Sequence, residues 1–176
     1  MAFVIEDTRL GCPPIASTLT ASTAAGRSTP WKLGDIVQAT DPVYGAGEFI
    51  YLLGVANTVV GSVVTYDGAN AGTPTWQTAL APSTANLGQP LAVAMSANVA
   101  NQYGWYQISG SAVMATNGTL AAGPGPVFLA GSGQVTSTQA NGKMVNNARN
   151  ETATGTPAAN QAVVKINRPF AQGQIV

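Results

Sequence analysis

From Gly34 onward, short runs of β-branched and aromatic residues alternate with Gly, Pro and Asn. Runs of this kind, bounded by turn residues, are typical of short β-strands. No heptad pattern is present, and Gly88 and Pro90 limit the Ala-rich stretch Pro82–Ala100 to one short helix at most. The sequence therefore predicts an all-β fold, either a compact β-barrel or a sandwich of short strands. The expected strands are Asp35–Ala39, Glu48–Leu53, Ser62–Tyr66, Leu91–Met95, Trp105–Ile108, Ala112–Thr116, Val127–Ala130, Gly133–Ser137 and Ala162–Asn167.

The first 33 residues lack this pattern, because Gly and Pro punctuate a stretch rich in Ser, Thr and Ala without a strand or helix period. We expect an extended N-terminal arm over residues 1–33 and a β-barrel-like domain over residues 34–176. Arms of this kind either stay disordered or become ordered on a neighbouring surface, where isolated apolar side chains anchor them. The predicted interface anchors of the arm are Phe3, Val4, Ile5 and Trp31.

Three local features of the domain follow from its turn residues and its aromatic pairs. A long loop is predicted near residues 68–81, where Gly and Pro surround an isolated Trp76. Asn117-Gly118 favours a type I′ hairpin turn, which would pair Val113–Thr116 with the residues from Thr119 on. Because successive side chains of a strand point to opposite faces, Trp105 and Tyr106 are expected on opposite faces of a sheet.

Charged residues are scarce and balanced, with seven Lys and Arg against seven Asp and Glu, and they make up 8% of the chain. Binding of phosphate backbones needs a surplus of Lys and Arg, so nucleic acid is not an expected partner. No apolar run approaches the roughly 20 residues of a bilayer span, and no membrane partner is expected. The chain also has no His, the commonest general base and metal ligand. We expect a protein that is not an enzyme and that uses no metal or cofactor.

One long stretch, from Gly68 to Gly142, contains no charged side chain. Soluble monomeric domains use charges to protect exposed strand edges and to discourage association. The uncharged stretch therefore predicts a surface covered by copies of this chain or by another protein; a neutral surface kept soluble by Thr, Asn and Gln is the alternative. Most acids precede this stretch and most basic residues follow it, an asymmetry that would orient neighbouring subunits if the two groups met.

The carboxylates are predicted to be turn residues rather than catalytic acids. Asp35 follows Gly34 at an expected strand start, and Asp41 precedes Pro42. A glycosidase would need two carboxylates across a cleft, and Glu48 with Asp41 is the pair that such an activity would require. We predict instead that Glu48 and Asp41 are turn or surface carboxylates without a catalytic role.

The single Cys12 and the N-terminal residues indicate where the protein is made. One cysteine forms no intrachain disulfide, so packing or assembly must stabilise the fold. The first residues lack a basic segment followed by an apolar one, which is the pattern of a secretory signal. We expect synthesis in the cytoplasm of a host cell.

Several short strings of the chain resemble a known family. They consist mainly of Gly and small apolar residues and extend over residues 34–169. With these strings the chain is similar to the small β-barrel capsid decoration (cement) proteins of tailed bacteriophages. The strings are Gly34-Asp35-Ile36-Val37, Leu87-Gly88-Gln89-Pro90-Leu91-Ala92-Val93-Ala94, Gly110-Ser111-Ala112-Val113, Leu120-Ala121-Ala122-Gly123-Pro124-Gly125-Pro126-Val127, Gly131-Ser132-Gly133-Gln134-Val135 and Ala162-Val163-Val164-Lys165-Ile166-Asn167-Arg168-Pro169.

The resemblance implies a non-enzymatic virion protein that binds the outer face of the major capsid protein lattice, as a homotrimer, and stabilises the shell. The alternative from another class is a virion fibre or a surface module that binds a bacterial glycan. That alternative would use Trp76, Tyr103 and Trp105 as exposed rings that stack on sugars.

Overall fold

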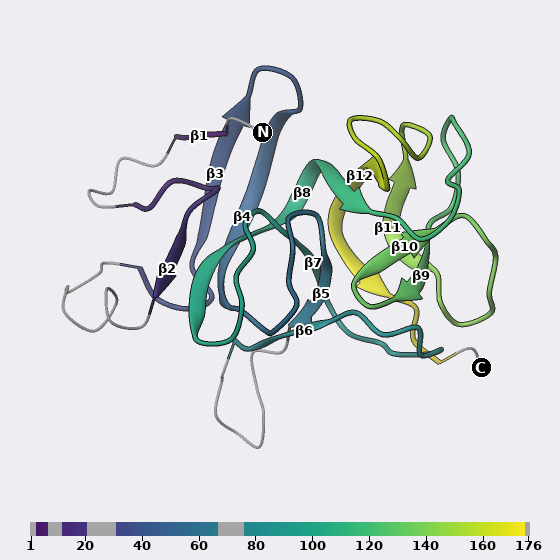
Figure 1. Ribbon diagram of the computed structural model, residues 1–176, viewed down its shortest axis with the longest axis horizontal. Coiled ribbons are helices and arrows are strands. Elements are labelled where there is room, and N and C mark those ends of the chain that lie inside the picture. The colour runs from purple at the N-terminus through teal and green to yellow at the C-terminus, as the bar shows by residue number, and fades with distance from the viewer. Residues whose placement is uncertain (1–2, 7–11, 21–30, 67–75, 175–176) are drawn as a thin grey trace.

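The computed structural model describes residues 3–6, 12–20, 31–66 and 76–174, and these residues form β-strands and no helix (Figure 1). The all-β prediction is therefore confirmed, and the Ala-rich stretch contributes a strand rather than a helix. The strands are β1 (Val4–Ile5), β2 (Thr18–Thr20), β3 (Ile36–Asp41), β4 (Gly45–Leu53), β5 (Val63–Tyr66), β6 (Thr78–Leu80), β7 (Leu91–Ala94), β8 (Gln102–Ala115), β9 (Phe128–Gly131), β10 (Gln134–Thr136), β11 (Val145–Asn150) and β12 (Gln161–Ala171).

The long strand β8 joins the two halves of the molecule. Its first part pairs with β4, from Tyr103 to Ser109, and its second part pairs with β12, from Ser109 to Ala115. Figure 1 shows β1–β4 on one side of β8 and β9–β12 on the other. Gly110 lies where the partners change, with φ +104°, and a Cβ there would lie 2.6 Å from the carbonyl oxygen of Ala46. Glycine therefore allows one strand to serve both halves.

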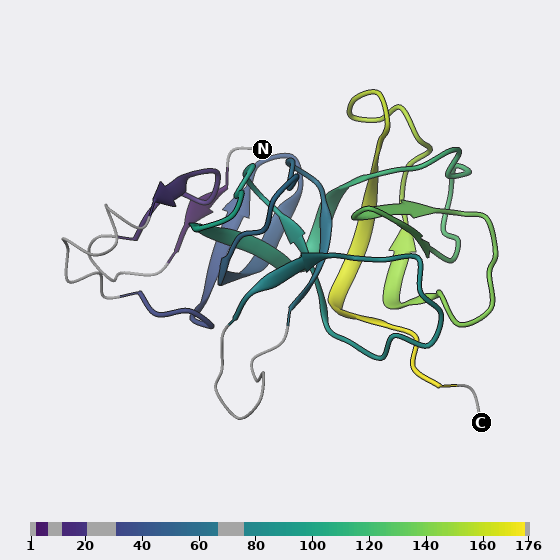
Figure 2. The same cartoon turned by 60° about the horizontal axis from the view of Figure 1, so that its bottom comes forward.

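The main sheet has the order β1-β3-β4-β8-β7-β5-β6, with β12 and β11 joined to it through β8, and every strand pair in it is antiparallel. The sheet does not close on itself, so the fold is sandwich-like and the barrel alternative is wrong. A closed barrel requires each strand to have two partners in a continuous ring. Here the order ends at β1 and β6. Figure 2 shows the first strands, purple to blue, on one side of the molecule and the last strands, green to yellow, on the other.

Three buried clusters fill the spaces on either side of the sheet. Trp105 packs in one of them and Tyr106 in another, so the predicted alternation of these two rings is confirmed. The first cluster, around Phe49 and Trp105, also contains Ile15 and Trp31. The second, around Leu52 and Tyr106, lies between β4, β5, β7 and β8. The third fills the half of the molecule that holds β9–β12.

The predicted hairpin at Asn117-Gly118 is wrong. The N–H of Thr116 donates to Asn160 and that of Asn117 to Val135, so β8 finds its neighbours far away in the sequence. Residues 119–127 form no strand, and Leu120 is fully buried in the third cluster. Burial of this leucine stabilises the observed path, and it overrides the local preference of the turn. The two expected strands over residues 105–108 and 112–116 are one strand.

The expected loop over residues 68–81 is partly replaced by a strand, since Thr78–Leu80 is β6 and pairs with β5. Residues 67–75 lie outside the described residues. The described parts of the expected arm do not form a separate unit. Ile15 and Trp31 are 2% and 4% exposed, and both pack in the cluster of Phe49 and Trp105. The neighbouring surface that orders these parts of the arm is the domain of the same chain.

Candidate functional site

The aromatic cluster beneath the N-terminal segment is held by rings from three parts of the chain. The rings of Trp31 and Trp105 meet edge to face, with centroids 5.4 Å apart, and Tyr51 lies 5.1 Å from Trp105. The Nε1–H of Trp105 donates to the carbonyl oxygen of Pro13 at 3.0 Å. Because indole needs a hydrogen-bond partner when buried, this bond ties residues 12–20 to the sheet.

The predicted arm anchors fall into two groups. Phe3 packs against Phe49 with ring centroids 4.8 Å apart, and Ile5 and Trp31 join the same cluster. Val4 alone of the four points outward, with 68% of its surface exposed. In the single chain three of these side chains are therefore occupied by contacts within the chain, and only Val4 is available to another molecule.

The three aromatic residues proposed as exposed rings do not form a common platform. Trp105 is fully buried, so its assignment as a surface aromatic is wrong. Tyr103 stacks on Tyr51, with centroids 6.3 Å apart and 18° between the planes. Trp76 packs against the cluster on the opposite face, that of Tyr106. Tyr103 and Trp105 belong to the cluster on one face of the sheet, and Trp76 packs with Tyr106 on the other face. The sheet therefore separates Trp76 from the other two rings.

Burial raises the pKa of Tyr51 to about 12, and Tyr103 and Cys12 add smaller effects in the same direction. The folded protein holds this proton more tightly than the unfolded chain, whose tyrosines titrate near 10. We therefore expect the free energy of unfolding to fall as the pH rises from about 10 to about 12. Urea unfolding at a series of alkaline pH values measures this slope. Tyr51→Phe is expected to reduce it, and an unchanged slope would contradict the assignment.

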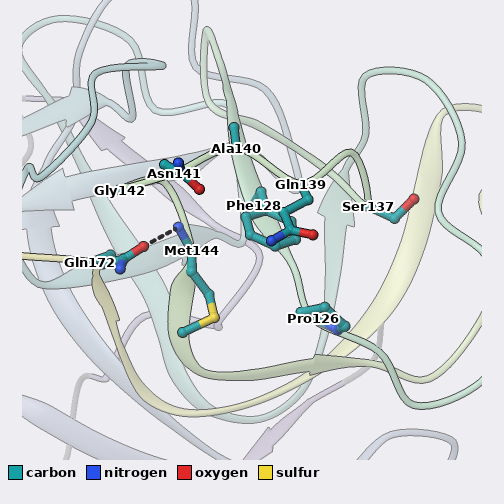
Figure 3. A pocket seen from close by; sticks show the side chains of 9 residues that line it. All are labelled: Pro126, Phe128, Ser137, Gln139, Ala140, Asn141, Gly142, Met144 and Gln172. Carbon is teal, nitrogen blue, oxygen red and sulfur yellow. Dashed lines mark hydrogen bonds between the residues drawn. The ribbon is translucent and has the colours of Figure 1, made fainter. Parts of the chain in front are cut away.

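An open pocket of about 360 Å³ lies at the other end of the molecule, among β9, the loop before β11 and the end of β12 (Figure 3). Phe128, which is 6% exposed, lies among its lining residues, and Met144 is 36% exposed. Phe170 precedes the lining residue Gln172 by two positions on the chain, and its side chain is also exposed. It is paired with Asn146 of β11. None of the lining residues is charged. They are Pro126, Phe128, Ser137, Gln139, Ala140, Asn141, Gly142, Met144 and Gln172.

Backbone contacts fix the shape of this pocket. The Met144 N–H donates to Oε1 of Gln172 at 3.2 Å, and the Gln172 N–H donates to the Met144 carbonyl at 2.9 Å. The Asn86 N–H donates to the carbonyl of Gly142 at 2.7 Å. A pocket held in this way needs little ordering before it binds, which favours affinity. Its side chains offer apolar surface and neutral amides, and they suit a neutral segment of another protein better than an ion.

Sequence reasoning missed the members of this pocket that matter most. Phe128 lies inside an expected strand, but Met144 and Gln172 lie outside all the expected strands. No local pattern marks them, because Met144 and Gln172 meet only through the long-range pairing of β11 with β12. The one signal that pointed here was the uncharged stretch, which contributes the residues from Pro126 to Gly142.

The carboxylates behave as turn and surface groups. Asp41 accepts hydrogen bonds from the N–H groups of Val43 and Tyr44, and Asp35 accepts one from the N–H of Lys32, so their prediction as turn residues is confirmed. Glu48 pairs with Arg168 at 3.2 Å. Asp41 is committed to its turn and is 2% exposed, so the pair Glu48 and Asp41 is not an acid pair facing one cleft. Within the described ranges, no three His, Cys, Asp or Glu residues cluster as metal ligands do.

Comparisons of the chain with protein-family models, with curated proteins and with solved structures find no match. In the part of the chain that the structure describes, no helix is long and apolar enough to cross a membrane.

Proposed function

We propose that this protein is a capsid decoration protein, which binds the outer surface of a phage major capsid lattice as a homotrimer and stabilises the shell. The observation that carries the proposal is the open pocket of Phe128 and Met144, whose lining residues are all uncharged. A fixed apolar surface of this kind marks a site of contact with another protein. The resemblance of residues 34–169 to decoration proteins supports the same function.

The stabilising effect follows from mass action. A protein that binds the assembled shell and not its dissociated subunits shifts the equilibrium toward the shell. Many copies, each in contact with adjacent capsid subunits, add a modest free energy per site, and the sum grows with the number of sites. The protein needs no reactive group for this function. It needs a rigid body and a preformed contact surface, and backbone hydrogen bonds hold the pocket of Phe128 and Met144 in this way.

Binding to shells tests the proposal. Undecorated shells, assembled from the major capsid protein of the phage that encodes this chain, are mixed with the purified protein and sedimented. We expect saturable co-sedimentation and a rise in the temperature at which the shells dissociate. Shells that neither retain the protein nor gain heat stability at saturating concentration would overturn the proposed function.

A pair of substitutions locates the contact. Phe170→Lys places a charge beside the uncharged pocket, at a side chain that is 39% exposed. We expect it to weaken shell binding by about tenfold or more, because an unpaired charge must lose water at the interface. Val43→Lys is the matched control, since Val43 is 79% exposed in the turn between β3 and β4. Equal binding of both variants would show that the pocket end does not contact the shell.

The alternative of a glycan-binding module depended on Trp76, Tyr103 and Trp105 as stacking rings. Trp105 is buried, and Tyr103 and Trp76 pack in clusters on opposite faces of the sheet. No second function is therefore advanced.

A further inference from the structure

Charged and polar residues of five strands lie along one face of the main sheet. Directly opposed residues of antiparallel strands share a face, and two rows of them cross strands β3, β4, β8, β12 and β11. The first row runs Gln38, Glu48, Ser109, Asn167. The second row runs Ser111, Lys165, Arg149. We call this face the charged strip. In Figure 1 the labels of its strands follow one another from left to right in the order β3, β4, β8, β12 and β11.

The two ends of the charged strip carry opposite charges. At the β1 end, Glu6 and Glu48 line one hollow of about 160 Å³. At the β11 end, Arg149 and Lys165 line an open groove of about 340 Å³ together with Asn147 and Asn167. Each end also holds one residue of the other sign: Arg168 pairs with Glu48 at the acidic end, and Glu151 accepts a hydrogen bond from Ser111 at the basic end. The acidic end therefore keeps an excess of negative charge, and the basic end keeps an excess of positive charge.

The basic end is unsatisfied in the single chain. Arg149 and Lys165 are directly opposite each other, and like charges in such a pair destabilise a sheet. Lys165 reaches Oγ of Ser111 at 3.4 Å, and Ser111 donates to Glu151 at 3.0 Å. Arg149 is exposed and has no ion pair with any residue in the described ranges. A carboxylate from another molecule would relieve this repulsion.

The acidic end has carboxylate oxygens to offer. Glu6 accepts a hydrogen bond from Thr40 through Oε1, and Glu6 is one of the residues that line the hollow. Both contacts of Arg168 with Glu48 use Oε2 of the carboxylate. Of the other described acids, Asp35 and Asp41 bind backbone N–H groups in turns, and Glu151 accepts a hydrogen bond from Ser111 beside the basic end. Glu6 and Glu48 are therefore the carboxylates that the acidic end presents.

We propose that copies of this chain associate head to tail through the charged strip, with the Arg149–Lys165 end of one copy against the Glu6–Glu48 end of the next. The argument is charge complementarity, since each copy carries both halves of the contact at opposite sides of its sheet. A contact between two different patches closes into a ring when the rotation allows it. The inference rests on the self-association in the proposed function and names its surface, but it does not depend on capsid binding.

Charge reversal tests this contact without any capsid. Arg149→Glu and Glu6→Lys each place like charges across the interface. Lys143→Glu is the control, because it makes the same change of charge as Arg149→Glu at a residue that belongs to neither row. Molar mass is measured by light scattering over a range of protein concentrations at low salt and at 1 M salt, where the screening length falls to about 3 Å. Thermal melts followed by circular dichroism establish that each variant is folded.

We expect the wild-type protein and Lys143→Glu to associate at low salt and to dissociate at high salt. Arg149→Glu and Glu6→Lys are each expected to weaken association by about tenfold or more. An equal mixture of these two variants is expected to recover association as hetero-oligomers, because the reversed ends attract each other. A wild-type protein that stays monomeric, or a mixture that does not recover, would overturn the inference. A wild-type monomer that still binds shells would overturn this inference and the homotrimer, and it would leave only the shell binding of the proposed function.

Discussion

Gly104→Ala is expected to lower the free energy of unfolding by about 3 kcal/mol. A Cβ at this position of β8 would lie 2.1 Å from Nδ2 and 2.6 Å from Oδ1 of Asn98. Asn98 is fully buried, so its amide has no solvent into which it can move. Urea unfolding followed by tryptophan fluorescence measures the loss. Gly173→Ala is the control, since the nearest atom to its Cβ would be 3.9 Å away and no loss is expected.

A double-mutant cycle identifies the clash as the cause. Asn98→Ala removes the side-chain atoms that a Cβ at position 104 would meet, so Gly104→Ala is expected to cost much less in that background. Gly54→Ala provides the contrast, because its Cβ would lie 2.3 Å from the backbone oxygen of Asn98. That clash remains when the side chain is shortened. Equal rescue of both glycine variants, or of neither, would contradict this account of the contact.

Trp105→Ala is expected to destabilise the protein by about 4 kcal/mol. The substitution removes a fully buried indole and its contacts with Trp31 and Tyr51, and it removes the N–H that this indole donates to the Pro13 carbonyl. Because this bond holds the segment 12–20 to the sheet, the segment is also expected to become sensitive to protease. Urea unfolding and limited proteolysis followed by mass spectrometry measure the two effects.

Trp105→Phe separates the ring from the hydrogen bond. It retains an aromatic side chain against Trp31 but loses the donor to Pro13. We expect a smaller loss of stability than for Trp105→Ala, together with earlier cleavage within residues 12–20. Unchanged proteolysis in both variants would mean that the Trp105–Pro13 bond does not secure this segment.

The packing of the N-terminal segment limits which surfaces can take part in assembly. Phe3, Ile5 and Trp31 were expected to anchor an arm on another molecule, and the described contacts occupy them within the chain. The proposed contacts between molecules therefore involve other surfaces: the uncharged pocket end for the shell, and the charged strip for a second copy. The variants Phe170→Lys and Arg149→Glu distinguish the two surfaces, since each is expected to impair one association and leave the other.

Sequence patterns predicted the strands that have a strong local signal. Segments rich in Val, Ile and aromatic residues, such as Glu48–Leu53 and Leu91–Met95, coincide closely with β4 and β7. The opposite placement of Trp105 and Tyr106 followed from the two-residue period alone. The turn role of Asp41 followed from its place before Pro42. Each of these features depends on neighbours in the sequence.

Strands without such a signal were missed. β11 has the sequence Val-Asn-Asn-Ala-Arg-Asn, and its pairing with β12 compensates for a composition that is poor for strands. β1 and β2 are short and depend on β3 and β8 for their hydrogen bonds. The hairpin at Asn117-Gly118 failed for the related reason that burial of Leu120 outweighs the turn preference.

By itself, then, the sequence determined an all-β chain with little charge, because strand propensity and composition are local properties. The tertiary structure alone decided which edges pair, that Trp31 and Trp105 share a core, and that Met144 and Gln172 meet beside Phe128. It also decided that Glu6 and Glu48 line one hollow and that Arg149 and Lys165 line another. The physical reason is that pairing and burial are summed over residues far apart in the chain, and no local pattern records that sum.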